Sequence, residues 1–251
     1  MIISGHQPVY LPWLGLFHKL SLCDCFVYMD TVQYLENDWN NRNKIRSPHG
    51  PMWLSIPINR KLSTSQNLND IVVFGFEKPT DKNFWQTVHW KSIEHNYKKA
   101  TYFNDYAEDL CKLYKDIIWE KLVDVCWAQF KLFNKWLDLE DIKVIRMSEH
   151  TFEGKKDSLV LDHCLKLKAD SVVFGKQGKN YVNYEIFKKH SINVFFQDYQ
   201  HPTYSQKFPG FETSMSVIDL VFNHGPNSKD ILLADNITKS ALLTGKHWFV
   251  E

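Results

Sequence analysis

The first side chains suited to chemistry stand directly behind the first apolar run of the chain. His6 and Gln7 follow Ile2-Ile3-Ser4-Gly5, and prolines at positions 8 and 12 forbid a regular helix before Trp13. In an α/β protein, ligands sit at the carboxyl end of a strand, facing the next helix. An imidazole and an amide there can hydrogen-bond phosphate oxygens or an acyl carbonyl, and His6 can act as a general base. The alternative is that both side chains only satisfy loop carbonyls.

Two charged residues belong to the elements that follow this turn. The apolar spacing from Trp13 to Leu20 predicts a helix, and Lys19 lies on it. Lys19 either reaches back to an anion or is a solvated surface lysine. Asp30 ends a second predicted strand, residues 25–30, where its carboxylate would orient His6 or bind a substrate amine.

A second polar cluster precedes a predicted hairpin. It consists of Gln33, Trp39, Asn41, Arg42 and Lys44. Arg42 is suited to a bidentate grip on phosphate or carboxylate, and Trp39 to stacking on a base or a sugar. Extended runs on both sides of Ser47-Pro48-His49-Gly50-Pro51 predict the hairpin. A loop held together by its own hydrogen bonds is the structural alternative.

Two more clusters lie in the second half of the chain. After a predicted strand at 171–174, the glycines of the Gly175–Tyr181 loop allow backbone N–H groups to approach an anion, and Lys179 adds charge. The loop lacks the spacing and the Ser or Thr of a Walker loop. Farther on, Asp219 and Asn223 share one face of a predicted helix at 214–224, which indicates either a buried site or a structural network.

Composition excludes several classes of protein. The formal net charge of the 251-residue chain is +1, which does not favour nucleic-acid binding. An apolar run of 18 residues and a signal-peptide pattern are both absent from the sequence, so we expect a cytoplasmic protein without a membrane span. The five cysteines include no CxxC pair, and no set of residues reaches a convincing metal-ligand count.

The order of elements predicts an α/β fold. Strands alternate with helices at both ends of the chain, which favours a Rossmann-like, mostly parallel sheet flanked by helices. We expect a single domain over residues 1–251, with residues 81–140 as a helical insertion or cap. Within that insertion, the predicted helices span residues 81–97, 106–117 and 118–137. A short strand is predicted just before it, at residues 71–74.

Several motifs resemble the WbqC-like family, in order and over nearly the whole chain. They are HQPVYLPWLGLFHK, DTVQY, WNNRNKI, WLSIPI, HNYKKATYFNDY, GKQGKNY and QDYQHPTYSQ…FETSMSVIDLVFNHGP. The resemblance implies a cytoplasmic role in bacterial surface polysaccharide (O-antigen) biosynthesis, with amide formation at a sugar amine. It carries over as site positions His6, Gln7, Tyr10, Trp13, Lys19, Asp30, Gln33, Trp39, Asn41, Arg42, Lys44, Tyr181, Tyr204, Gln206, Asp219 and Asn223.

A looser similarity concerns the fold. The His-bearing loop after the first strand and the VVFGxK strand end are similar to the Rossmann-like nucleotidylyltransferase and pantothenate-synthetase superfamily, although the HxGH spacing is absent.

Three functions follow as hypotheses. The first is an N-acyltransferase that moves an acyl or aminoacyl group from coenzyme A or an acyl carrier protein to the amine of a nucleotide-linked amino sugar. His6 or Asp30 would take the proton, Gln7 or Asn41 would steady the oxyanion, and Arg42 and Lys44 would hold phosphate. The second is an ATP-dependent ligase with the same product. The third is a non-catalytic binding or scaffold protein of the same pathway.

Overall fold

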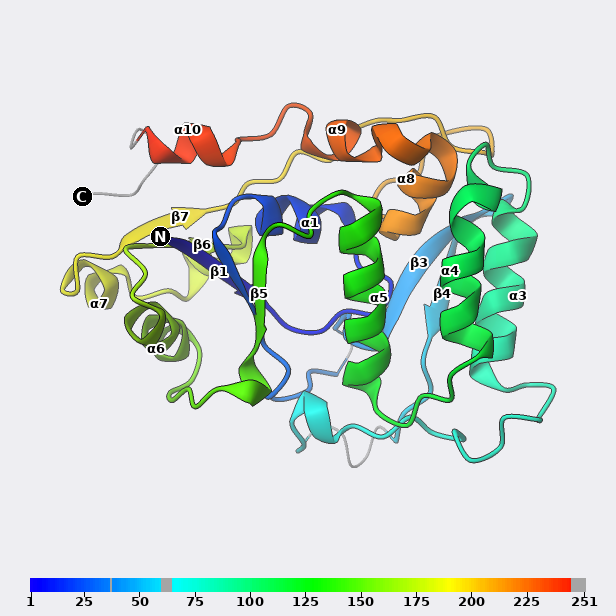
Figure 1. Ribbon diagram of the computed structural model, residues 1–251, viewed down its shortest axis with the longest axis horizontal. Coiled ribbons are helices and arrows are strands. Elements are labelled where there is room, and N and C mark those ends of the chain that lie inside the picture. The colour runs from blue at the N-terminus through cyan, green and yellow to red at the C-terminus, as the bar shows by residue number, and fades with distance from the viewer. Residues whose placement is uncertain (37, 60–64, 245–251) are drawn as a thin grey trace.

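The centre of the protein is a sheet of five parallel strands. The computed structural model describes residues 1–36, 38–59 and 65–244. The strand order is β5-β2-β1-β6-β7, and every neighbouring pair is parallel. The strands are β1 (Ile2–His6), β2 (Cys25–Tyr28), β5 (Lys143–Arg146), β6 (Ser171–Phe174) and β7 (Asn193–Phe196). The predicted α/β architecture with a mostly parallel sheet is confirmed (Figure 1).

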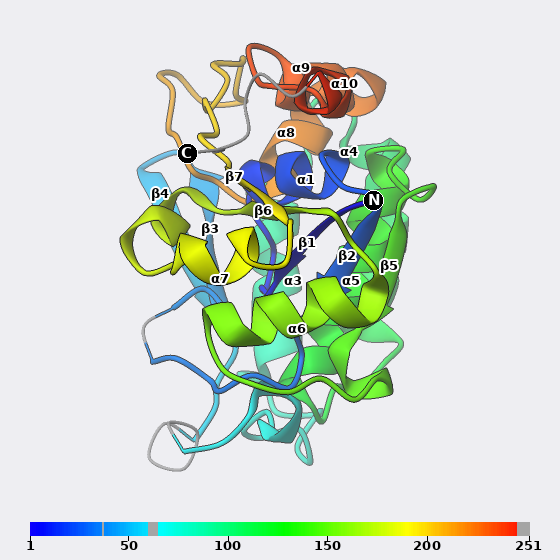
Figure 2. The same ribbon diagram turned by 90° about the vertical axis from the view of Figure 1, so that its left-hand side faces the viewer.

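Helices cover both faces of this sheet (Figure 2). They are α1 (Leu14–Ser21) and α5 (Leu122–Trp136) on one face, and α6 (Asp157–Leu167) and α7 (Tyr184–Lys188) on the other. Because side chains alternate along a strand, Ile2 packs into the α1/α5 core and Ile3 into the α6/α7 core. The near-continuous apolar strands of the sequence are explained by this double burial.

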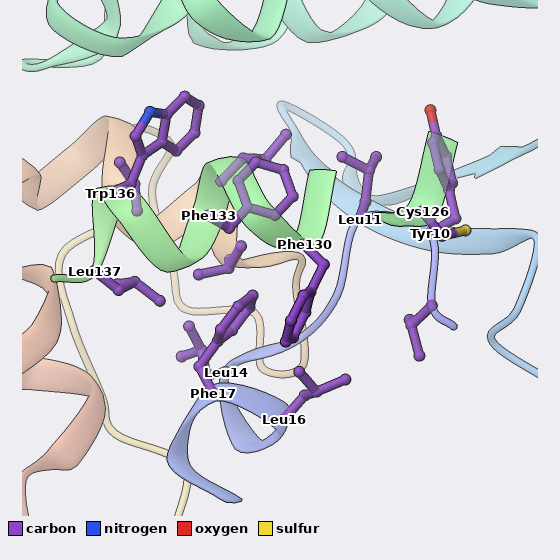
Figure 3. Packing of buried hydrophobic residues seen from close by; sticks show 14 of the residues in the cluster. Tyr10, Leu11, Leu14, Leu16, Phe17, Cys126, Phe130, Phe133, Trp136 and Leu137 are labelled. Atoms are coloured by element: carbon purple, nitrogen blue, oxygen red, sulfur yellow. The ribbon is translucent and has the colours of Figure 1, made fainter. Parts of the chain in front are cut away.

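Aromatic rings of α1 and α5 pack against each other (Figure 3), and Phe130 also contacts the sheet. The rings of Phe17 and Phe130 stack with centroids 6.1 Å apart, and Phe26 of β2 lies 5.8 Å from Phe130. The predicted helix at 118–137 begins only at Leu122. Residues 118–121 are extended instead, because the Glu120 carbonyl and the Leu122 N–H bond the backbone of residues 71–73.

Other predicted boundaries were wrong. The strand expected at 71–74 forms only isolated bridges, Val73 with Ile58 and Val72 with Lys121. The helix expected from Asp81 is α3 (Trp85–Tyr97), because Asp81 instead closes a local turn by accepting the Asn83 and Phe84 N–H groups.

Four further helices differ from the sequence prediction. The helix expected at 106–117 is α4 (Phe103–Lys115), and the one expected at 214–224 is α8 (Val217–His224). Ser214 has φ +59°, which a right-handed helix excludes, and Ser216 forms the N-cap. Helices α9 (Ser228–Leu233) and α10 (Lys239–Leu243) were not predicted.

The predicted hairpin is confirmed as β3 (Arg42–Ser47) and β4 (Gly50–Ser55), an antiparallel pair. Its turn uses Gly50 at φ +106°, a conformation that favours glycine. The hairpin packs against α3 and α8, and α5 lies between the five-stranded sheet and the α3/α4 pair (Figure 1).

The α6/α7 core contains a buried histidine that predicts acid sensitivity. Burial lowers the pKa of His163 from its ordinary value of 6.5 to about 4, and its Nε2 has no hydrogen-bond partner among the described residues. Below pH 6.5 the unfolded chain binds a proton at His163 that the folded protein does not bind. The stability of the fold is therefore unaffected by this group above pH 6.5, and it falls as the pH drops toward 4. Wild type should therefore lose free energy of unfolding as the pH falls from 6.5 to 4.5. In His163→Phe this loss should be smaller by about 1.4 kcal/mol per pH unit.

Denaturant unfolding at both pH values measures this effect. His190→Phe, at an exposed position, is the matched control and should leave the pH dependence unchanged. Equal slopes for wild type and His163→Phe would contradict the prediction.

Candidate functional site

The carboxyl end of β1 is the topological switch point of the sheet. From β1 the chain proceeds to β2 and β5 on one side, and then to β6 and β7 on the other. Pairing of β1 with β2 extends to His6 and Tyr28, but pairing with β6 ends at Ser4 and Val173. Strands β1 and β6 therefore separate before the level of His6. Space is also open at Gly175, just after β6, because a Cβ added there would meet no atom within 4 Å. Open α/β sheets bind ligands at such a point.

His6 and Lys19 form the charged centre of this point. Lys19 Nζ donates a 2.9 Å hydrogen bond to the carbonyl of Gly5. His6 is half-buried and its Nδ1 lies 2.8 Å from the Gln7 carbonyl oxygen. Burial, together with the charge of Lys19, lowers the pKa of His6 to about 3, so the imidazole is neutral at physiological pH. Position 5 needs glycine because a Cβ would approach the Val27 carbonyl oxygen to 2.9 Å.

Lys19 is a buried cation without an ion-pair partner. Its exposed fraction is 5%, so the alternative of a solvated surface lysine is wrong. Within residues 1–36, 38–59 and 65–244, no carboxylate lies within ion-pair distance of Nζ, and Gly5 O is its hydrogen-bond acceptor. Burial lowers the pKa of Lys19 to about 8. An ammonium group with unused donors at a switch point favours the binding of an anion or of a developing negative charge.

A row of aromatic rings leads from His6 to the hairpin. Ring centroids are 5.3 Å apart for His6 and Trp13, and 5.8 Å apart for Trp13 and Trp39. Trp39 in turn stacks on Trp53 at 5.4 Å. The guanidinium of Arg42 lies 5.0 Å from the Trp53 ring centre. The structure thus joins two clusters that are separate in the sequence.

Asparagine side chains hold the loop after β1 against the hairpin. Asn40 Nδ2 donates to the Pro8 carbonyl at 2.8 Å and lies 3.3 Å from Gln7 Oε1, and Asn43 Nδ2 donates to the Leu11 carbonyl at 2.6 Å. Asn41, predicted as a substrate ligand, is buried and donates to the Ile56 carbonyl at 2.8 Å. The structural alternative of a self-bonded loop therefore describes this asparagine cluster.

Asp30 lies at the same edge of the sheet, but its carboxylate is already occupied. It accepts hydrogen bonds from Arg146 Nε at 2.8 Å, Ser148 N at 2.8 Å and Ser148 Oγ at 2.7 Å. In the described part of the chain it makes no hydrogen bond to His6. Arg146 ends β5, so this ion pair joins the carboxyl ends of two adjacent strands.

Four predicted residues form a second buried cluster around Asp219. Its carboxylate accepts hydrogen bonds from Tyr97, Tyr204 and Gln206 at 2.8–2.9 Å, and its own carbonyl accepts one from Asn223. Burial raises the pKa of Asp219, against the effect of these donors. The Tyr97 hydroxyl also accepts the N–H of Arg46 in β3, so the cluster holds the hairpin to α3 and α8.

The remaining predicted residues lie apart from the switch-point centre. Tyr10 is fully buried, and its hydroxyl contacts His89 and Tyr114 in the helical core. Gln33 is exposed and forms a bridge with Asn67. Lys179 and Tyr181 are exposed on the loop after β6.

Sequence reasoning missed Trp53 and Arg146. Trp53 stands next to the buried Leu54 in the predicted hairpin, so alternation along the strand would have indicated an outward-facing ring. Arg146 stands at the end of a strand, which is where ligand-binding residues of an α/β sheet are expected. Two surface hollows lie elsewhere, one between α3 and α4 beside Phe103 and one at the start of α5 beside Trp127. Neither is lined by a predicted site residue.

The described residues (1–36, 38–59 and 65–244) contain no group of three or more His, Cys, Asp or Glu side chains that could hold a metal ion. Across the same residues, every helix is too short or too polar to cross a bilayer.

The fold and its switch-point centre define a Rossmann-like α/β protein. The chain belongs to the WbqC-like protein family, whose model matches residues 7–231. It is also 30% identical over 230 residues to "Uncharacterized protein Rv1507c" of Mycobacterium tuberculosis, which covers 90% of this chain and 95% of the relative. No solved structure matches the chain significantly.

The occupied carboxylate of Asp30 predicts a structural effect of its replacement. Asp30→Asn should lower the free energy of unfolding by about 2–3 kcal/mol, because Arg146 loses its nearer and fully buried carboxylate partner and keeps only the distant, half-exposed Asp124. Denaturant unfolding near neutral pH measures this change. Glu108→Gln, which breaks an exposed pair with Lys112, is the control and should leave stability unchanged. Wild-type stability of Asp30→Asn would contradict the structural role.

Proposed function

We propose that this protein is an enzyme that forms an amide at the amine of a nucleotide-linked amino sugar. The acyl or aminoacyl group would come from coenzyme A or an acyl carrier protein, and the product would serve surface polysaccharide (O-antigen) biosynthesis in the cytoplasm. The proposal rests on two neighbouring groups at the switch point: a neutral His6 imidazole, and a buried Lys19 ammonium that has no carboxylate partner among the described residues. Membership of the WbqC-like family is consistent with it.

His6 supplies the base in this proposal. The substrate amine attacks the carbonyl carbon of the thioester and forms the C–N bond. His6 accepts the proton that the attacking nitrogen loses, and the proton leaves with the thiolate when the C–S bond breaks. A depressed pKa keeps His6 in its base form at neutral pH, and negative charge bound beside Lys19 would raise its basicity.

Lys19 supplies electrostatic stabilisation. The carbonyl oxygen gains negative charge in the tetrahedral intermediate, and a fixed ammonium in a site of low dielectric stabilises that charge strongly. Lys19 is held in place by Gly5 O and by burial, so it needs little reorganisation during the reaction. Asp30, whose carboxylate is occupied by Arg146 and Ser148, takes no part in this scheme.

An ATP-dependent ligase is the second candidate. It is favoured by the open space at Gly175 beside the switch point, where Rossmann-like folds hold nucleotides. The acid would then be activated as an acyl-adenylate, and AMP would be the leaving group. Release of AMP distinguishes this enzyme from the thioester-dependent transferase.

The catalytic proposal predicts the effects of two substitutions. His6→Ala should lower the turnover of an amino-sugar substrate by about 100- to 10,000-fold, the range for loss of a general base. Lys19→Met should also lower turnover. Wild-type activity should decline as the pH rises through about 8, because Lys19 then loses its proton.

The assay pairs UDP-, dTDP- and GDP-linked amino sugars with acetyl-CoA, or with acetate and ATP, and measures thiol and AMP release separately. Lys91→Met, at an exposed position on α3, is the control for Lys19→Met. Thermal unfolding establishes that each variant is folded. Full activity of a folded His6→Ala variant would exclude His6 as the base and favour the scaffold hypothesis.

A further inference from the structure

We propose that the outer face of the β3–β4 hairpin is the subsite that binds the nucleoside diphosphate portion of the substrate, with the base stacked beside Trp53. This inference rests on the proposed function, because it assigns the hairpin to the same substrate whose amine reaches His6. It adds the place where the nucleotide portion of that substrate binds, and a residue, Trp53, that contacts its base.

The strand register places one tryptophan and two cations on a single face of the hairpin. Lys44 lies directly opposite Trp53, and Arg42 lies two residues before Lys44 on the same strand. Since side chains alternate between faces, all three point the same way. The Lys44 ammonium is 5.9 Å from the Trp53 ring centre, and the Arg42 guanidinium is 5.0 Å from it.

Most side chains on the opposite face of the hairpin are buried, although Met52 there is partly exposed. Asn43 donates to the Leu11 carbonyl, and Ile45 is fully buried. Burial therefore explains the inner face of the hairpin, but it does not explain Trp53, whose exposed fraction is 48%. A ring that is nearly half exposed, with two cations beside it, is suited to binding an anionic aromatic ligand.

The ring row connects this face to the reacting centre. Trp39 stacks on Trp53, and Trp13 lies between Trp39 and His6. A base at Trp53 would leave the rest of an extended sugar nucleotide to run along the row, with its amine at His6. In this proposal the row of rings fixes the orientation of the substrate, with its base at the hairpin and its amine at the end of β1.

The residue types favour a nucleotide over an uncharged sugar. Base–aromatic stacking is strong and tolerates different bases, and an arginine or lysine beside the ring suits the attached phosphates. In the described parts of the chain, no carboxylate lies within ion-pair distance of Lys44. Its charge is therefore available to a diphosphate.

Isothermal titration of the full chain with UDP, dTDP, GDP and pyrophosphate tests the proposal without any turnover. Trp53→Ala should weaken binding of the nucleoside diphosphates about tenfold or more, through loss of stacking. It should change pyrophosphate binding less than twofold. Trp53→Phe should restore part of the affinity, and Lys44→Gln should weaken pyrophosphate and the nucleotides alike.

Met52→Ala is the matched control, because Met52 is also exposed but alternates to the opposite face of the same strand. Thermal unfolding checks the fold of each variant. If Trp53→Ala binds UDP, dTDP and GDP as tightly as wild type does, the subsite is overturned while the chemistry at His6 stands. If wild type binds none of them at millimolar concentration, the nucleotide subsite is also overturned, and the assay of His6→Ala with simple amino sugars judges the proposed function separately.

Discussion

Helix α1 has no solvent face, and much of the structure depends on that constraint. It lies between the sheet and the C-terminal helices, and all residues from Leu14 to Leu20 are buried. Every polar group on α1 must therefore find a partner inside the protein. His18 bonds Gln197 and the Ile237 carbonyl, and both partners satisfy a neutral imidazole. Among the described residues, the Gly5 carbonyl at the end of β1 is the acceptor of Lys19 Nζ.

The polar clusters differ in whether their charged groups already have hydrogen-bond and ion-pair partners within the protein. Asp30 has Arg146 and Ser148, and Asp219 has two tyrosines and a glutamine. Buried charges satisfied in this way hold elements together. The Lys19 and His6 pair differs, because a cation without a counter-charge is most stable when a ligand supplies one. The difference in hydrogen bonding, more than the kind of residue, identifies the candidate centre.

The loop from Gln7 to Trp13 connects this centre to the hairpin. Its two prolines leave backbone carbonyls without strand or helix partners, and the amides of Asn40 and Asn43 bond those carbonyls. The loop thereby brings Trp13 between His6 and Trp39. A segment without regular structure thus has a defined shape, because side chains of a distant hairpin supply its missing hydrogen bonds.

Local patterns were sufficient for most elements of the sheet. Strands β1, β2 and β6, the hairpin and helix α1 follow from apolar runs, periodicity and turn residues, which act over a few neighbours. Helix starts were less accurate where long-range contacts intervened. Residues 118–121 have a helical apolar spacing, but hydrogen bonds to residues 71–73 keep them extended.

For the site, the sequence by itself determined that His6, Gln7 and Asp30 follow buried strands, because alternation and turn chemistry are local. Only the tertiary structure decided which of these groups are satisfied. Asp30 is neutralised by an arginine 116 residues away, while Lys19 is buried with no carboxylate partner in the part of the chain that the structure describes. Trp53 joins the row through a contact with Trp39 across the hairpin. Charge compensation and burial depend on residues far apart in the chain, and no local pattern encodes them.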